Sequence, residues 1–129
     1  MHQETELTGI VVDQAVRIHK ELGRGLGENV YEVVLAGALE REGLRVERQK
    51  AIDIKFDGMS FPAAFRMDLL IEEHLIVEVK SVERLATVHA KQLLTYLRLS
   101  KLRFGLLLNF SGETMKEGIR RVVNGYGSE

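Results

Sequence analysis

The stretch Leu75–Ser81, LIVEVKS, reads as a buried β-strand that carries two charges. Leucine, isoleucine and two valines fill most of it, but Glu78 and Lys80 stand two residues apart inside the run. Side chains alternate between the two faces of a strand, so both charges point the same way. Burial alone does not explain an acid and a base on one face of such a strand, which makes the pair a candidate for chemistry.

Hydrophobic periodicity around this strand predicts a layered α/β or α+β fold. Apolar residues at helical spacing predict helices over about 5–22, 28–42 and 85–99. Alternation and short apolar runs predict strands beginning at Val46 and over 61–71, 75–80 and 103–109, with a hairpin turn at Asp57-Gly58. The tail 114–123 fits either a helix or an edge strand. The predicted order ααβββαβ gives a sheet of mixed direction covered by helices.

Composition limits the classes of protein that the chain can belong to. The 129 residues suffice for one domain, which we expect to span 1–129. The chain has no cysteine, and its four histidines lack the spacing of a zinc site, so neither disulfides nor a cysteine or histidine zinc centre is expected. No apolar run reaches the ~20 residues of a membrane span, and the first residues do not resemble a signal peptide, so we expect no membrane association and a cytoplasmic location.

A second carboxylate is predicted to lie beside Glu78. Asp68 is on the preceding strand, and a tight turn at 72–74 folds that strand against Leu75–Lys80. Two neighbouring carboxylates repel each other, and burial makes this repulsion more costly. A divalent cation removes the conflict, and Mg²⁺ is commonly held by one or two carboxylates together with water and substrate phosphate. The pattern D-x(9)-E-x-K therefore suits phosphodiester hydrolysis, with Lys80 serving water or phosphate.

A simpler interpretation of the same residues is a solvated sheet edge with a weak ion pair. Two further features favour a site. Gln92 and Tyr96 share one face of the helix that follows the strand. Glu28 opens a helix directly after a glycine-rich turn, where a carboxylate also interacts well with the helix dipole. Tyr31, one turn later, could equally be a core tyrosine.

Four short motifs now stand in a fixed order along the chain. They are GLGENVY (25–31), FRMDLLI (65–71), VEVK (77–80) and QLLTY (92–96), which match G-x-x-E-x-x-Y, an isolated aspartate, E-x-K and Q-x-x-x-Y. Together they resemble the GxxExxY family, a branch of the PD-(D/E)XK nuclease superfamily. The resemblance extends over nearly the whole chain.

The resemblance implies a restriction-endonuclease-like, three-layer core in which a central mixed sheet is flanked by helices. It also implies an active set. The expected ligands of Mg²⁺, or of Mn²⁺ in its place, are Glu28, Asp68, Glu78 and the Val79 carbonyl group. Lys80 would serve the attacking water, and Gln92 with Tyr96 would complete the site.

The function implied is metal-dependent hydrolysis of nucleic acid. Arg66, Arg84 and Lys91 flank the expected site and are candidates for phosphate contacts. Aromatic residues make up only 6% of the chain, which argues against readout by base stacking. We therefore expect a nucleic acid partner, DNA in the first place, bound with low sequence specificity. A bare core of this size would work as a homodimer or with a partner protein.

Two alternatives remain open at the level of sequence. The first is a catalytically silent module of the same fold that binds or assembles, which the balanced net charge of −1 supports. The second is a metal-dependent hydrolase of a small phosphodiester, although the chain has neither a P-loop nor a Rossmann glycine motif. The intact set of acids and lysine favours the nuclease, because two uncompensated acids in one pocket are unfavourable in a scaffold.

Overall fold

The computed structural model describes residues 4–125; residues 1–3 and 126–129, which belong to the domain predicted over 1–129, lie outside the described residues. The elements are, in chain order, α1 (Glu4–Leu22), α2 (Glu28–Arg41), β1 (Val46–Phe56), β2 (Met59–Ile71), β3 (Leu75–Lys80), α3 (Thr87–Ser100), β4 (Phe104–Asn109), a short 3₁₀ turn η1 (Lys116–Gly118) and β5 (Ile119–Val123).

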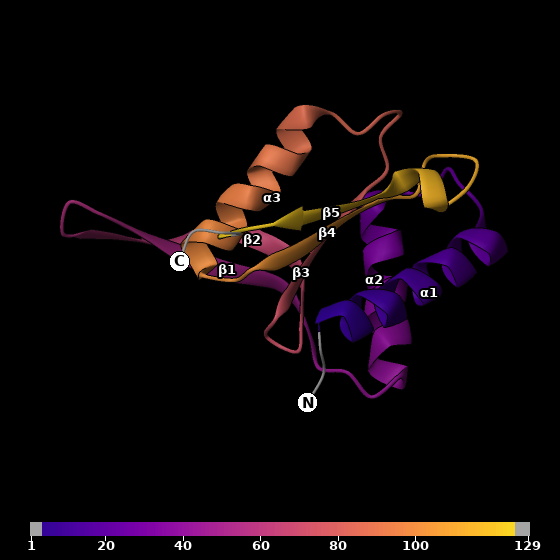
Figure 1. Cartoon of the computed structure of the whole chain (residues 1–129), viewed down its shortest axis with the longest axis horizontal. Coiled ribbons are helices and arrows are strands. Elements are labelled where there is room, and N and C mark those ends of the chain that lie inside the picture. Colours follow the sequence, from indigo (N-terminus) through magenta and orange to yellow (C-terminus); the bar gives the residue numbers. More distant parts are fainter. Residues whose placement is uncertain (1–3, 126–129) are drawn as a thin grey trace.

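The five strands of the described chain form one sheet in the order β1-β2-β3-β4-β5. β3 and β4 run parallel, and the other neighbouring pairs are antiparallel. A parallel pair needs a long crossover connection, which α3 provides (Figure 1). The mixed sheet predicted from the sequence is therefore confirmed, with β5 as an additional edge strand.

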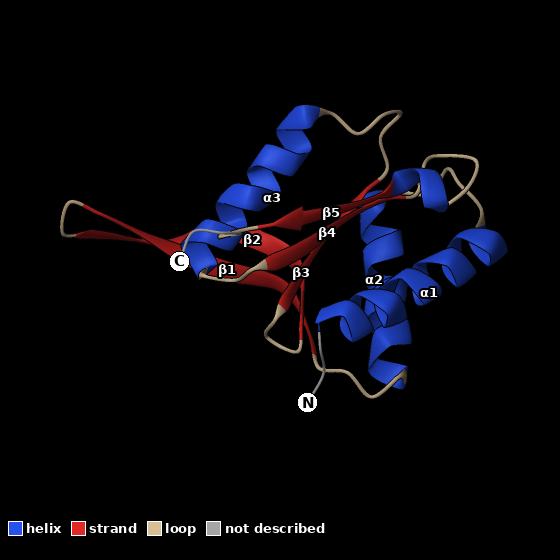
Figure 2. Cartoon of the chain, in the orientation of Figure 1, coloured by secondary structure: helices blue, strands red, loops and turns tan. Residues whose placement is uncertain are grey.

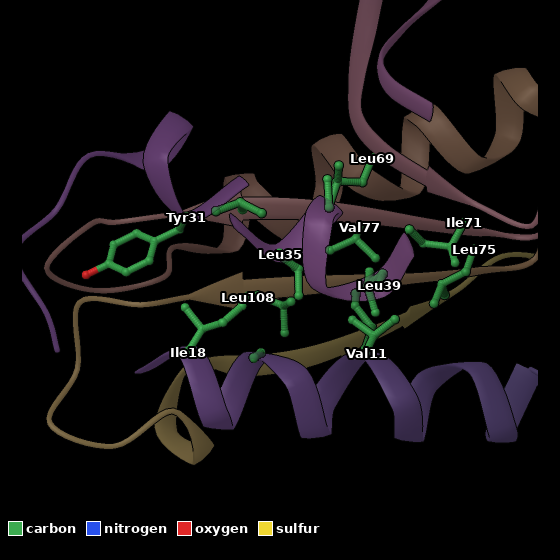
Figure 3. Packing of buried hydrophobic residues seen from close by; sticks show 14 of the residues in the cluster. Val11, Ile18, Tyr31, Leu35, Leu39, Leu69, Ile71, Leu75, Val77 and Leu108 are labelled. Atoms are coloured by element: carbon green, nitrogen blue, oxygen red, sulfur yellow. The ribbon is translucent and has the colours of Figure 1, made fainter. Parts of the chain in front are cut away.

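Helices pack on both faces of the sheet, with α1 and α2 on one and α3 on the other (Figure 2). The larger core, shown in Figure 3, joins the first two helices to the sheet and includes Val11, Ile18, Leu35, Leu39, Leu69, Val77 and Leu108. The smaller core joins α3 to the sheet and includes Met67, Ile76, Leu93, Leu97 and Leu107. Each fully buried aliphatic side chain contributes about 1.5–3 kcal/mol. The expected three-layer architecture is confirmed.

The alternation of side chains along β2 slips at Asp68. Met67 packs in the core under α3, whereas Leu69, two residues later, packs in the core under α1 and α2. Residues two apart normally share a face of a strand, so the backbone departs from regular pleating here. Asp68 thus lies at a local irregularity inside β2, three residues before the strand ends at Ile71.

β1 and β2 form a long hairpin that extends away from the rest of the molecule (Figure 1). Its turn is Asp57-Gly58, with φ values of 54° and 76°, as expected for the Asp-Gly hairpin signal. The return strand begins at Met59, two residues before the predicted start. Phe56, Met59 and Phe61 near the turn are exposed.

The tail adopts the extended form of the two structures left open by its sequence. Ile119–Val123 pairs antiparallel with β4, and this pairing supplies the backbone hydrogen bonds that a helix would otherwise have made. None of the helices in residues 4–125 combines the length and the apolar character needed to cross a membrane.

Candidate active site

Asp68 and Glu78 meet where β2 and β3 stop pairing through their backbones. The ladder between the strands reaches Leu69 and Val77. At the next position the side chains take over: the Asp68 amide donates to Glu78 Oε2 at 2.9 Å, and the Val79 amide donates to Asp68 Oδ2 at 2.9 Å. These reciprocal hydrogen bonds fix both carboxylates where the two strands separate, beyond Leu69 and Val77; this place is called the fork below.

The two acids share an electrostatic conflict. Burial and then the neighbouring Asp68 carboxylate raise the pKa of Glu78 to about 8. Burial also raises the pKa of Asp68, although the Val79 amide and the Gln49 side chain act in the opposite direction. Glu78 is only 4% exposed, which excludes a solvated sheet edge for this residue.

Lys80 and Tyr96 complete one side of this site. Lys80 is half-buried two residues after Glu78, and its positive charge lowers the pKa of both Asp68 and Glu78. The Tyr96 ring comes from α3 and stacks on Phe65, with 4.2 Å between the ring centroids. Burial, followed by the charges of Glu78 and Asp68, raises the pKa of Tyr96. The Tyr96 phenol therefore interacts electrostatically with both acids.

Gln92 lies one helical turn before Tyr96 on α3 and is exposed. Among the residues that the structure describes, it is not hydrogen-bonded to either acid, so its predicted role depends on the motif alone.

Glu28 reaches the same region from the first residue of α2. Its Oε2 accepts a hydrogen bond from the Ser81 amide at 3.0 Å, directly after Lys80. The Ser81 hydroxyl donates to the Leu26 carbonyl oxygen at 3.1 Å, which fastens the glycine-rich turn to the end of β3. The Glu28 charge also raises the pKa of Asp68. The structure therefore places Glu28 beside the acid pair.

Tyr31 packs in the core and shapes the turn before α2. Its ring stacks on Phe110 at 4.3 Å between centroids. Its hydroxyl donates to the Gly23 carbonyl oxygen at 2.6 Å and accepts from the Leu26 amide at 3.2 Å. These contacts identify Tyr31 as a residue that positions the start of α2.

Replacing Tyr31 with phenylalanine should therefore lower stability without altering the acid pair. The variant keeps the stacking on Phe110 and leaves two backbone groups without their partner, which costs about 1–3 kcal/mol. Urea denaturation measures this loss, and metal affinity should match that of the wild type. A variant of unchanged stability would contradict the structural role, and a large loss of metal affinity would indicate a direct role in the site.

Two polar residues that the sequence did not single out adjoin the site. Glu32 is 4% exposed and accepts hydrogen bonds from Arg48 Nε at 3.2 Å and from Gln49 Nε2 at 3.0 Å. The same Gln49 amide nitrogen donates to Asp68 Oδ1 at 3.3 Å. Glu32 follows Glu28 by four residues, a spacing that predicts a shared helix face. The sequence around Gln49 gives no comparable signal.

The three basic residues expected at the substrate lie in different places. Arg66 Nη1 donates to the backbone carbonyl oxygen of Gln49 at 3.2 Å, and the side chain of Gln49 in turn contacts Asp68. Arg84 lines a shallow cavity with Asn109 and Arg120, beyond the carboxyl ends of β3 and β4. Lys91 is exposed on α3.

The donor set at the fork suits a hard divalent cation. Within residues 4–125, no three histidine, aspartate or glutamate side chains are already arranged as a metal-binding cluster. Mg²⁺ nevertheless needs only one or two carboxylates, because water and substrate phosphate complete its shell. Glu78 provides a buried carboxylate and Asp68 a partly buried one, and a cation would relieve the repulsion between them.

Comparison with known proteins places this arrangement in a family. The family model described as the PD-(D/E)XK nuclease superfamily matches residues 5–122. The comparisons with curated proteins and with solved structures gave no match. The matched span runs from α1 into β5 and includes the acid pair, Lys80 and the polar face of α3. The chain belongs to the PD-(D/E)XK nuclease superfamily.

Proposed function

We propose that this chain hydrolyses phosphodiester bonds of nucleic acid with Mg²⁺ as its cofactor, for which Mn²⁺ would substitute. The observation that carries the proposal is the pair Asp68 and Glu78, two carboxylates fixed side by side with Lys80 on the same strand. A neutral pair would fold more favourably at this position, so the acids have a cost that a metal-binding function explains.

Asp68 and Glu78 are the principal proposed ligands of the cation. Glu28 and the Val79 carbonyl oxygen are further candidates, because Glu28 sits beside the end of β3 and Val79 lies between Glu78 and Lys80. The bound ion would polarise the scissile phosphate and lower the pKa of a water molecule.

The side chains around the acids have separate proposed tasks. The Lys80 ammonium group orients the attacking water and stabilises the negative charge that develops on the phosphoryl oxygens. The Tyr96 phenol is protonated at neutral pH, and the raised pKa reinforces this, so its hydroxyl can donate a hydrogen bond to phosphate. Gln92, on the same face of α3, would do the same with its amide.

The proposed substrate is DNA, bound mainly through its phosphates and with low sequence specificity. Arg66, Arg84 and Lys91 would contact the backbone, so binding should weaken as salt concentration rises. We also infer that residues 1–129 act as one nuclease-like domain, which would function as a homodimer or with a partner protein.

Exchange of Lys80 for alanine tests the division of tasks. We expect cleavage of labelled single- and double-stranded DNA to fall by about 10²–10³-fold, because a donor aimed at developing charge is lost. Mn²⁺ affinity by calorimetry should be retained, since the proposed ligands remain. Lys55→Ala, on the exposed hairpin, is the control and should behave as the wild type. Full activity in Lys80→Ala would overturn the role of this lysine.

A second candidate is a binding or assembly module without turnover. The observation that favours it is the surface of α2 and of the turn before it, where Val30, Val33 and Val34 of the helix and Leu26 of the turn are exposed, although the opposite side of the helix is buried in the core. An exposed apolar stripe of this kind is typical of an interaction surface. DNA that binds the wild type but is never cleaved with Mg²⁺ or Mn²⁺ would favour this function.

A further inference from the structure

Gln49 has a backbone conformation that its residue type does not favour. It lies inside β1 with φ of 53°, in the left-handed region. Its neighbours Arg48 and Lys50 pair with Leu69 and Met67, so Gln49 stands opposite Asp68. A non-glycine residue in this region is uncommon, and such conformations persist where the surrounding structure holds them and where they serve a site.

The Gln49 amide bridges two carboxylates. Its nitrogen lies 3.0 Å from both oxygens of Glu32 and 3.3 Å from Asp68 Oδ1. A primary amide has two hydrogens, so each acid receives one of them. Ionised carboxylates only accept, and this fixes which way the amide is turned.

Neighbouring arginines hold this bridge from two sides. Arg66 Nη1 donates to the backbone carbonyl oxygen of Gln49 at 3.2 Å, and Arg48 Nε donates to Glu32 Oε2 at 3.2 Å. Glu32 is buried, so it forms a fixed anchor for the amide. Asp68 then has a donor on each oxygen, the Val79 amide on Oδ2 and Gln49 on Oδ1. The Asp68 carboxylate is therefore oriented from both sides before any ligand arrives.

We propose that Gln49 is a positioning residue of the active site, which holds the Asp68 carboxylate in the orientation that binds the divalent cation and takes its own anchor from Glu32. This inference rests on the proposed function. A glycine would adopt the same backbone conformation without strain, so the presence of glutamine is explained by its side chain. Partners that orient a metal-ligating group typically change metal affinity by 10–100-fold when they are removed.

The test compares Gln49→Met and Gln49→Gly. Gln49→Met keeps the length of the side chain and removes the amide. Gln49→Gly also removes the amide and in addition relieves the strain of the left-handed backbone conformation. Mn²⁺ affinity by calorimetry should fall by about 10–100-fold in both. The rate of cleavage of labelled DNA at saturating Mn²⁺ should change much less. Ala63→Gly is the matched control, because Ala63 has a similar φ of 51° on the exposed hairpin, and its metal affinity should not change.

A double-mutant cycle with Glu32→Gln identifies the anchor. The effect of Gln49→Met on metal affinity should be largely absent in the Glu32→Gln background, because the two residues act as one unit. Wild-type metal affinity in folded Gln49→Met and Gln49→Gly, with a change in melting temperature alone, would show a merely structural role and overturn this inference while the proposed function stands. If the wild type neither binds Mn²⁺ nor cleaves DNA, the proposed function fails and this inference fails with it.

Discussion

Asp68→Asn is expected to cleave DNA more than about a hundredfold more slowly than the wild type while its fold is retained. Partners that merely orient a metal ligand are already worth 10–100-fold, so the removal of a direct ligand should cost more. The substitution keeps the size of the side chain and one oxygen that can accept from the Val79 amide. Cleavage assays with Mg²⁺ and thermal unfolding measure the two effects separately.

The cost of Asp68→Asn to stability should be small because two changes oppose each other. The new amide faces the donor nitrogen of Gln49, which weakens that contact. Where Glu78 is ionised, its repulsion with the Asp68 carboxylate disappears at the same time. Asp53→Asn is the matched control. Asp53 also accepts a hydrogen bond from a backbone amide, that of Ala63 at 2.8 Å, but it lies on the exposed hairpin. Equal activity in the two variants would contradict the assignment of the site.

Glu78→Gln is expected to stabilise the metal-free protein at alkaline pH and to abolish cleavage. In the folded chain the pKa of Glu78 is raised from 4.5 to about 8, so the native state holds a proton that the unfolded state releases between these values. The contribution of Glu78 to the stability of the wild type should therefore be fully present below pH 4.5 and should be lost as pH rises through this window. Glutamine has no proton to lose, so the Glu78→Gln variant should be more stable than the wild type above pH 8, by as much as about 5 kcal/mol.

Denaturant unfolding of both proteins between pH 4.5 and 9, in the presence of a chelator, measures this difference. The two free energies of unfolding should converge at the acidic end and separate as pH rises. Mg²⁺ added at pH 8 should stabilise the wild type and leave Glu78→Gln unaffected. Glu47→Gln, at an exposed position of β1, controls for the general change of charge. If Glu78→Gln is the less stable protein at pH 8, Glu78 serves as a structural ion-pair partner.

Most of the fold was predictable because its signals are local. The alternation along β2 and the buried run of β3 each identify a strand, and the Asp57-Gly58 turn joins the first two strands. The tail stayed ambiguous, since its apolar residues fit both helical and extended spacing. Only the pairing of Ile119–Val123 with β4 decides between the two, and that contact is made by a distant part of the chain.

The residues of the site likewise differ in whether local sequence patterns could predict them. Asp68 and Glu78 are joined by one tight turn, so their contact could be predicted from the strand register. Glu28 and Ser81 are 53 residues apart. The glycine-rich turn marked Glu28 as a candidate, but only the resemblance to a family grouped it with the two acids. The role of Gln49 depends on a left-handed backbone inside a strand, which no property of glutamine predicts. Local patterns therefore indicated the two central acids, and tertiary structure was needed for the residues that position them.

Calorimetric titration of Mn²⁺ into the wild type, Asp68→Asn and Asp53→Asn tests the central claim most directly. The claim is that Asp68 and Glu78, where β2 and β3 stop pairing, form a working metal site. We predict that the wild type and Asp53→Asn bind the ion with equal affinity and that Asp68→Asn does not bind it measurably. Binding that survives in Asp68→Asn with unchanged affinity would contradict the account.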